Sequence, residues 1–222
     1  MEISKRYERF EQLYVHDIYS KISSDFNVTR AYNWKAVKEF LNKMSVDSNG
    51  IDIGCGNGRN ILFRPELRLI GIDKCEELVE VCKEKKLKVI KGDALAIPFK
   101  KNSFDYAMSI AVFHHLSNSK RRHKALNEMI RILKSGGVGL LSVWSLEQPE
   151  SSRRKFTLGD NLVKWKFRDP EHNHNILETF DRYYYISDYA DFIKYIDNFK
   201  DVIHVDKIFN EHGNWYCEFT KL

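Results

Sequence analysis

Apolar positions in the first part of the chain, residues 1–46, return at intervals of three and four residues. This spacing predicts two helices, each with one buried face. The first apolar set is Phe10, Leu13, Tyr14, Ile18 and Ile22, and the second is Trp34, Val37, Phe40, Leu41 and Met44. The segment 23–32 between them is rich in polar and aromatic side chains. We expect a loop there whose groups face a ligand.

From residue 50 onward, short apolar runs alternate with amphipathic stretches. We expect strands at 50–53, 67–72, 88–91, 105–110 and 138–144, with helices between them. The helix over 119–134 is followed by Gly136-Gly137, which predicts a glycine C-cap. Strands that alternate with helices predict a parallel sheet with helices on both faces.

The last third of the chain has a different pattern. Residues 145–181 show no clear periodicity, and we expect an irregular insertion on the substrate side. A strand at 182–186, a helix capped by Ser187 and strands at 202–209 and 215–220 follow; residues 211–214 read as a hairpin turn. We expect one domain over 1–222, with a helical lid at 1–46 and an α/β core at 47–222.

The most informative interruption of the pattern is Ile51–Gly58, where three glycines occupy alternate positions directly after a strand. A dinucleotide-binding loop reads Gly-x-Gly-x-x-Gly and holds a pyrophosphate. Here the third glycine comes one residue early, and Asp52 precedes the loop. An acid there repels phosphate but suits an ammonium group. S-adenosylmethionine (SAM) carries that ammonium and no phosphate, although a glycine loop alone is a weak signal.

Further polar residues follow the expected strands, and ligands of open α/β sheets bind at the carboxyl ends of strands. Asp73 can accept the ribose hydroxyls of a nucleoside, and Asp93 with Ala94 can contact an adenine. Each acid alone is more often a turn carboxylate, but their order along the chain favours SAM. The expected cofactor set is Asp52, Gly54, Cys55, Gly56, Gly58, Asp73, Asp93, Ala94 and Ile110.

Composition narrows the partners only slightly. The net charge of +5 permits a nucleic-acid partner without requiring one. No apolar run is long enough to span a bilayer, and the first residues lack a signal core, so we expect no membrane partner. The four cysteines, at 55, 75, 82 and 217, form no Cys-x-x-Cys pair. We therefore expect no metal site in this chain and a reducing compartment.

The chain resembles the class I SAM-dependent methyltransferases, and more closely the eukaryotic tRNA wobble-uridine carboxymethyl methyltransferases. The matching motifs lie at 14–19, 26–30, 51–58, 104–115, 144–148, 151–154, 182–185 and 214–215. The pair of histidines at 114–115 and the Trp-Ser-Leu-Glu-Gln and Ser-Ser-Arg-Arg stretches are the specific parts. The chain departs from the family in its short 155–181 segment and in Leu116, where the family usually has Trp.

The resemblance implies a Rossmann-like fold with a mostly parallel seven-stranded sheet, helices on both faces and a C-terminal antiparallel hairpin. It also implies methylation of 5-carboxymethyluridine in the tRNA anticodon loop to its methyl ester. The implied partner is a small zinc-binding activator protein, which forms a heterodimer at the edge strand 88–91. The expected compartment is the cytoplasm, with the nucleus as a second option.

A carboxylate acceptor has simple chemical needs. It is already ionised at neutral pH, so the site needs no general base but must align the reactants and exclude water. Arg30 is the first candidate to hold it, because a guanidinium offers a bidentate fork. Arg30 could equally hold the methionine carboxylate of SAM or form a surface ion pair. His16, Tyr19 and His114 (or His115) are further candidates.

Basic residues suggest where RNA would bind. Cations at a helix N-terminus are disfavoured by the helix dipole, so Lys120–Lys124 calls for an anionic partner such as phosphate. The expected RNA-binding residues are Arg121, Arg122, Lys124, Arg153 and Arg154. For any single cluster, a solvated surface is the simpler explanation. Two other functions remain open: a methyltransferase of a small carboxylate or other metabolite, and an inactive methyltransferase-like binding module.

Overall fold

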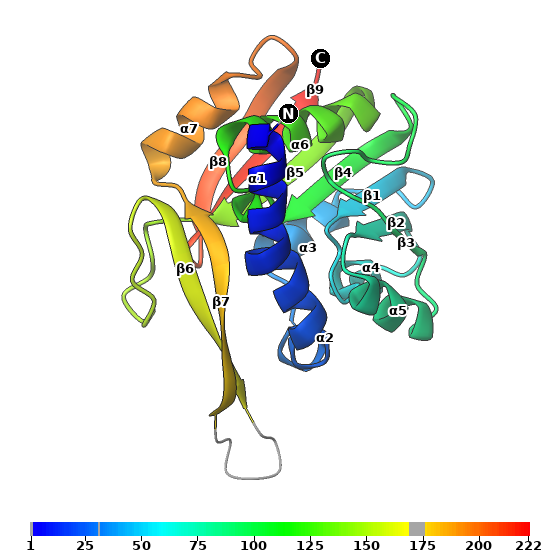
Figure 1. Ribbon diagram of the computed structural model, residues 1–222. Helices are drawn as coiled ribbons and strands as arrows, with labels where there is room; N and C mark the ends of the chain where they lie inside the picture. Colours follow the sequence, from blue (N-terminus) through cyan, green and yellow to red (C-terminus); the bar gives the residue numbers. More distant parts are fainter. Residues whose placement is uncertain (1, 31, 169–175) are drawn as a thin grey trace.

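A computed structural model describes residues 2–30, 32–168 and 176–222, which are organised around one seven-stranded sheet (Figure 1). The strand order is β3-β2-β1-β4-β5-β9-β8. Strands β1 to β5 pair in parallel, whereas β9 is antiparallel to both β5 and β8. The predicted sheet and its C-terminal hairpin are therefore confirmed. The bounds are β1 Asn49–Ile53, β2 Arg68–Asp73, β3 Val89–Lys91, β4 Phe104–Ile110, β5 Leu133–Trp144, β8 Ile203–Glu211 and β9 Asn214–Lys221.

Helices cover both faces of this sheet, as the alternating pattern predicts. On one face, side chains of α3 (Lys35–Asn42), α4 (Arg59–Phe63) and α5 (Glu76–Glu84) form a buried cluster with Tyr106 and Tyr216. On the other face, α6 (Ser119–Ile132) and α7 (Tyr189–Asp197) pack with a 3₁₀ turn at Phe113–His115. None of the helices in the described ranges is long and apolar enough to cross a bilayer.

The N-terminal segment is more helical than the sequence predicts. Helix α1 (Glu2–Glu11) continues through a π-helical turn, Gln12–His16, into α2 (Asp17–Thr29). The loop predicted at 23–32 is therefore wrong over 23–29. A tertiary contact supports the helix there, because Ile18 and Ile22 pack on Trp165 and the indole N–H donates to Asp25 at 2.9 Å.

The segment predicted as irregular contains a long β-ribbon. Strands β6 (Gly159–Arg168) and β7 (Ile176–Ile186) pair antiparallel as a separate two-stranded sheet. Figure 1 shows this ribbon projecting from the body of the protein beside α2. Its outer side chains are mostly charged or solvated, so the alternation of apolar positions is weak. Residues 169–175 of the predicted insertion lie outside the described residues.

Two predicted helix ends are also wrong. Helix α6 ends at Ile132, and Gly136, at φ +75°, lies within β5 rather than at a C-cap. The strand takes over because Leu133 and then residues 138–142 pair with β4, and Gly136 lies in the irregular part between them. Helix α7 is capped by Asp188, whose carboxylate accepts from the Asp191 N–H at 2.8 Å. Ser187 is instead buried, and it forms an isolated β-bridge with Ser145.

Candidate active site

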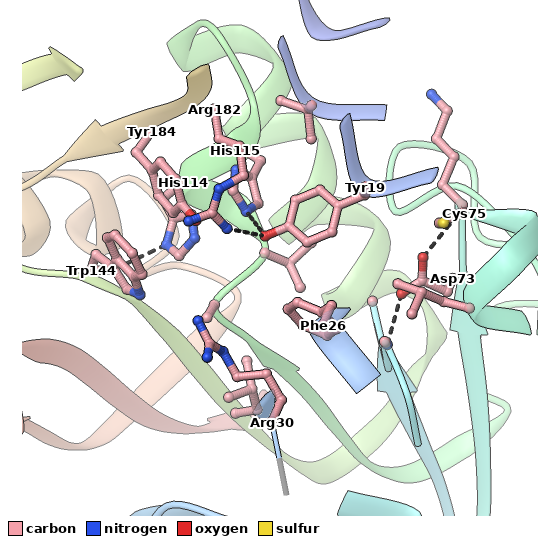
Figure 2. Close-up of a pocket in the computed structure, with 18 of the residues that line it drawn as sticks. Tyr19, Phe26, Arg30, Asp73, Cys75, His114, His115, Trp144, Arg182 and Tyr184 are labelled. Atoms are coloured by element: carbon pink, nitrogen blue, oxygen red, sulfur yellow. Dashed lines mark hydrogen bonds between the residues drawn. The ribbon is translucent and has the colours of Figure 1, made fainter. Parts of the chain in front are cut away.

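A cavity of about 420 Å³ opens at the carboxyl ends of β1, β2 and β4, beneath α2 (Figure 2). Its walls differ in character, and we name two halves by their residues. The cofactor half comprises Gly54, Gly56, Asp73, Lys74, Cys75, Leu78, Gly92, Asp93, Ala94 and Ile110. The acceptor half comprises Tyr19, Phe26, Arg30, His114, His115, Trp144, Arg154, Arg182 and Tyr184.

The glycine loop needs its glycines for conformation and for space. Gly54, Gly56 and Gly58 have φ values of +74°, +56° and +75°, which side-chain-bearing residues rarely adopt. A Cβ at Gly54 would lie 2.4 Å from Val112, and one at Gly56 would lie 3.2 Å from Phe26. The loop therefore presents bare backbone to the cavity.

Asp73 ties this loop to the end of β2. Its carboxylate accepts from the Gly56 N–H at 2.8 Å and from the Cys75 N–H at 2.9 Å. Burial raises the pKa of Asp73, and these amide donors oppose the shift. The neighbouring Asp93 accepts from Lys74 and from the Leu95 N–H, and these bonds outweigh burial and lower its pKa. Two acids thus face the cavity where the sequence places a nucleoside.

Three of the predicted cofactor residues lie behind the wall rather than in it. Asp52 is fully buried, accepts from Asn60 at 3.0 Å, and keeps its other oxygen without a partner in the described structure. Burial raises its pKa to about 7. Cys55 packs against β2, and a Cβ on Gly58 would lie 3.0 Å from Cys82 of α5 and 2.3 Å from Leu87, which follows that helix. These residues shape the loop from beneath, which corrects their placement as contact residues.

The two histidines of the acceptor half are neutral and have fixed tautomers. The backbone N–H of Trp144 donates to Nδ1 of His114 at 3.1 Å, so the proton of His114 is on Nε2. His115 donates from Nδ1 to the Tyr183 carbonyl at 2.8 Å and accepts at Nε2 from the Tyr19 hydroxyl at 2.9 Å. Burial lowers the pKa of His115 to about 3 and that of His114 well below its usual value.

Arg30, Arg154 and Arg182 make the acceptor half positive. Each guanidinium lies against an aromatic ring: Arg30 and Arg182 at 5.3 and 4.5 Å from the ring centre of Trp165, and Arg154 at 4.4 Å from that of Trp144. Among the described residues, the acceptor half contains no Asp or Glu. An anion is therefore the ligand that this wall favours.

The structure brings Arg30, Tyr19 and His114 together, as the sequence predicts. His16 also lines the cavity, but its charged neighbours are Lys74, Glu11, Asp93 and Arg121 rather than the arginines of the acceptor half. Its Nε2 is buried without a partner in the described residues, and burial lowers its pKa to about 4. His16 thus lies toward the cofactor half.

Sequence reasoning missed three residues of the acceptor half: Trp144, Arg182 and Tyr184. The run at 182–185 reads as an ordinary strand, because one arginine followed by three tyrosines gives no periodicity that separates a site from a core. The strand direction decides it, since β7 turns Arg182 and Tyr184 to the same side (Figure 2).

Two of the predicted RNA-binding arginines are engaged within the protein. Arg121 forms a bidentate pair with the buried Glu11 at 2.6 and 2.8 Å. Arg122 lies 3.6 Å from the ring centre of Tyr185 and donates to the Leu116 carbonyl. Glu11 therefore supplies the anion that the N-terminus of α6 requires, which corrects the argument for phosphate there. The remaining predicted residues are Lys124 and Arg153, both exposed, and Arg154, which lines the cavity.

Comparison with known proteins gives one family and several relatives. Residues 51–141 match the family described as "Methyltransferase domain". The chain is 44% identical over 148 residues to the tRNA (carboxymethyluridine(34)-5-O)-methyltransferase of Schizosaccharomyces pombe, which covers 67% of this chain and 64% of that protein. The enzyme of the same name in Saccharomyces cerevisiae is 38% identical over 170 residues, covering 74% and 60% of the two chains. Mouse ALKBH8, named for the same activity, is 38% identical over 162 residues, covering 72% and 24%. The chain thus spans less than two thirds of each of these relatives.

Solved structures show the same fold. A SAM-dependent methyltransferase from Aquifex aeolicus aligns with a TM-score of 0.57 and 17% identity over 84% of this chain and 89% of that one. A methyltransferase from Haloferax volcanii, solved in complex with the Trm112 methyltransferase activator, aligns with a TM-score of 0.63 and 19% identity over 93% and 97%. At these identities the likeness concerns the fold.

Proposed function

We propose that the chain methylates the carboxylate of 5-carboxymethyluridine at the wobble position of tRNA, because it has a methyltransferase domain, the fold of SAM-dependent methyltransferases and 38–44% identity to tRNA (carboxymethyluridine(34)-5-O)-methyltransferases. The product is the methyl ester. This specific reaction is carried over from relatives of which the chain spans only a part, and the acceptor half supports it independently.

The cofactor is SAM, and the cofactor half fits it. Asp73 and Asp93 offer carboxylates to a nucleoside, and the bare backbone at Gly54 and Gly56 allows close approach. When bound, SAM supplies a methyl group carried on a sulfonium sulfur.

One observation carries the proposal: the acceptor half is lined by arginines but offers no general base. Both histidines use their unprotonated nitrogens internally, His114 toward the Trp144 N–H and His115 toward Tyr19. No carboxylate stands in for them among the described residues of this half. A hydroxyl or amine acceptor would need its proton removed, whereas a carboxylate arrives ionised.

The remaining work of the acceptor half is orientation and exclusion of water. The guanidinium groups hold the carboxylate, and the N–H on Nε2 of His114 is a neutral donor within the same wall. The rings of Phe26, Trp144 and Tyr184 close the cavity with apolar surface (Figure 2). A dry and positive wall aligns the carboxylate oxygen with the methyl carbon without forming a bond to it.

The proposal includes tRNA and a zinc-binding activator as partners. Exposed cations at Lys124 and Arg153 support contacts with phosphates. An open strand edge at β3 supports pairing with another chain, and the Haloferax neighbour was solved with such an activator. We propose a heterodimer formed at β3.

The test is methyl transfer from tritiated SAM to total tRNA that lacks the final ester, with the chain co-expressed with its activator. We expect incorporation into tRNA and release of the label as methanol by mild alkali, which cleaves an ester. Label that resists alkali would indicate another acceptor atom. Transfer to free carboxylates but not to tRNA would indicate a small-molecule methyltransferase.

A further inference from the structure

We infer that Arg182 is the residue that binds the carboxylate of the acceptor, and that Tyr19 and His115 hold the Arg182 guanidinium in position. The inference rests on the proposed function and deepens it by assigning the recognition of the carboxylate to one buried guanidinium. It separates Arg182 from Arg30 and Arg154, which share the same wall.

Arg182 is buried in a way that demands a partner. Its exposed fraction is 4%, its Nε has no hydrogen-bond partner, and it forms no ion pair within the described residues. A guanidinium keeps its charge in proteins, and burying an unpaired charge is unfavourable. The rings of Trp165, Tyr184 and Tyr19, at 4.5, 5.2 and 5.9 Å, offset part of this penalty but do not accept its N–H groups in the plane. An anion entering the cavity would.

A chain of hydrogen bonds fixes the direction in which Arg182 points. Nδ1–H of His115 donates a hydrogen bond to the Tyr183 carbonyl, so Nε2 of the neutral ring can only accept. The Tyr19 hydroxyl donates to that nitrogen, and its oxygen is then free to accept from Nη1 of Arg182 at 3.4 Å. Figure 2 shows the two contacts of the Tyr19 hydroxyl, with His115 and with Arg182. Nη1 is engaged and Nε is buried, so Nη2 is the nitrogen of the guanidinium that remains for a ligand in the cavity.

Arg30 and Arg154 lack these constraints. Arg154 is exposed and Arg30 is half-buried, whereas Arg182 is 4% exposed, and the one hydrogen bond that the Arg30 guanidinium makes in the described structure goes to the carbonyl of its chain neighbour Thr29. Their greater exposure suits contacts to phosphate or to the periphery of the nucleoside. A residue that must hold a carboxylate oxygen in line with the methyl carbon has to be rigid, and Arg182 is the rigid one.

The arrangement also predicts selectivity. The polar groups available to the ligand, the Arg182 N–H groups and the His114 Nε2–H, are donors. A carboxylate satisfies them, whereas the amide nitrogen of a carboxamide would oppose donor to donor and leave buried groups unpaired. The acceptor half should therefore prefer the acid to its amide.

The experiment compares Arg182→Met, Arg182→Lys and Tyr19→Phe with Lys21→Met, in the complex with the activator. Lys21 is the matched control, since its ammonium lies over Phe180 of β7 but does not line the cavity. Three quantities are measured: kcat/KM on tRNA, SAM affinity by calorimetry, and binding of ¹³C-acetate by NMR in the presence of S-adenosylhomocysteine.

We expect Arg182→Met to lower kcat/KM at least 100-fold and to abolish acetate binding, with SAM affinity changed less than twofold. Arg182→Lys keeps the charge but not the fork and should remain impaired at least tenfold. Tyr19→Phe should lower kcat about tenfold, since it removes only the hydroxyl that orients Arg182. Lys21→Met should match the wild type.

The assignment is overturned if Arg182→Met methylates tRNA and binds acetate as the wild type does. If that variant fails to fold, as judged by its SAM affinity, Tyr19→Phe decides, and unchanged kcat there removes the positioning role. If the wild type does not methylate tRNA but binds acetate through Arg182, the proposed function fails while the anion site stands. If tRNA is methylated without Arg182, only the anion site fails.

Discussion

Single residues in this cavity act mainly by fixing which atoms donate and which accept. Asp73 is an example, because both of its oxygens already accept backbone N–H groups and it still faces the cavity. Its carboxylate therefore both shapes the glycine loop and offers lone pairs to a ligand.

We predict that Asp73→Ala weakens SAM binding by about 10- to 100-fold, because a hydrogen bond to a charged group and the tether on Gly56 are both lost. Calorimetric titration of SAM is the measurement. Asp47→Ala is the control, since Asp47 is 82% exposed and pairs only with Arg68 in the described residues. Equal affinities for the two variants would remove Asp73 from the cofactor site.

The histidines make a prediction about pH. Burial lowers the pKa of His115 to about 3 and that of His114 well below its usual value, so burial favours the neutral form of both, and burial raises the pKa of Tyr184. A carboxyl acceptor, with a pKa of ~4, is ionised from about pH 6 upward. We therefore expect kcat at saturating SAM to stay flat from about pH 6 to 9. A tenfold rise per pH unit would indicate an acceptor that must lose a proton.

At the scale of elements, the N-terminal helix is attached to the core by a buried ion pair. Glu11 is 1% exposed and accepts four hydrogen bonds, from the Ser117 N–H and hydroxyl and from two nitrogens of Arg121. This contact fixes α1 against α6 and so places Tyr19 and Phe26 of α2 over the cavity.

We predict that Glu11→Ala lowers the free energy of unfolding by about 3–5 kcal/mol, because it removes four hydrogen bonds and leaves the largely buried Arg121 with only its 3.7 Å contact to Glu8. Urea denaturation measures the loss, and hydrogen exchange should rise first within 2–29. The control is Glu39→Ala, which breaks an exposed pair with Lys35 and should cost at most about 0.5 kcal/mol. A loss as small as that of the control would mean that α1 is held by its apolar face alone.

The segment between β5 and β6 is the best-placed basic element for RNA. Arg153 and Lys155 are exposed on either side of Arg154, which lines the cavity. We predict that the double change Arg153→Glu and Lys155→Glu raises the tRNA KM at least tenfold and lowers the salt slope of binding by about 1.4, at ~0.7 per phosphate contact on a single strand. SAM affinity should not change.

The matched control places the same charge reversal at the opposite end of the sheet. Lys100→Glu with Lys101→Glu alters exposed lysines just before β4, away from the strand ends that form the cavity. If both double variants weaken tRNA binding equally, net charge explains the effect and the segment has no specific contact.

At the scale of the whole molecule, the two edges of the sheet are β3 and β8. The Gly71 N–H donates to the Lys88 carbonyl, and the Gly92 N–H donates to the Asp73 carbonyl, so residues 88 and 92 face β2. Backbone groups alternate in direction along a strand, and the N–H of Val89 therefore points to the open edge. This edge is where we propose that the activator pairs.

Val89→Pro tests that pairing, because it removes an outward N–H without breaking a bond to β2. We predict that the variant fails to recover the activator in a co-expression pull-down, whereas Val89→Thr, which keeps the N–H, recovers it. Thermal unfolding of both variants monitors the fold. Recovery by the proline variant, or full activity of the wild-type chain purified alone, would contradict the proposed heterodimer.

Local sequence determined the sheet and the cofactor half. The strands, the glycine loop and the acids Asp73 and Asp93 follow from short-range patterns, because strand ends of a parallel sheet meet at one edge whatever the rest of the chain does. Apolar periodicity likewise gives α3, α5 and most of α6, since each buries one face.

Tertiary structure decided which residues complete the acceptor half around Arg30, Tyr19 and His114. Arg182 lies 163 residues from Tyr19, and only the packing of β7 on α2 joins them. The same packing stabilises helix at 23–29, where the sequence predicts a loop. Glu11 pairs with Arg121, which the local charge pattern assigned to RNA binding. Contacts between distant segments depend on which faces meet, and a pattern read along one segment does not contain that information.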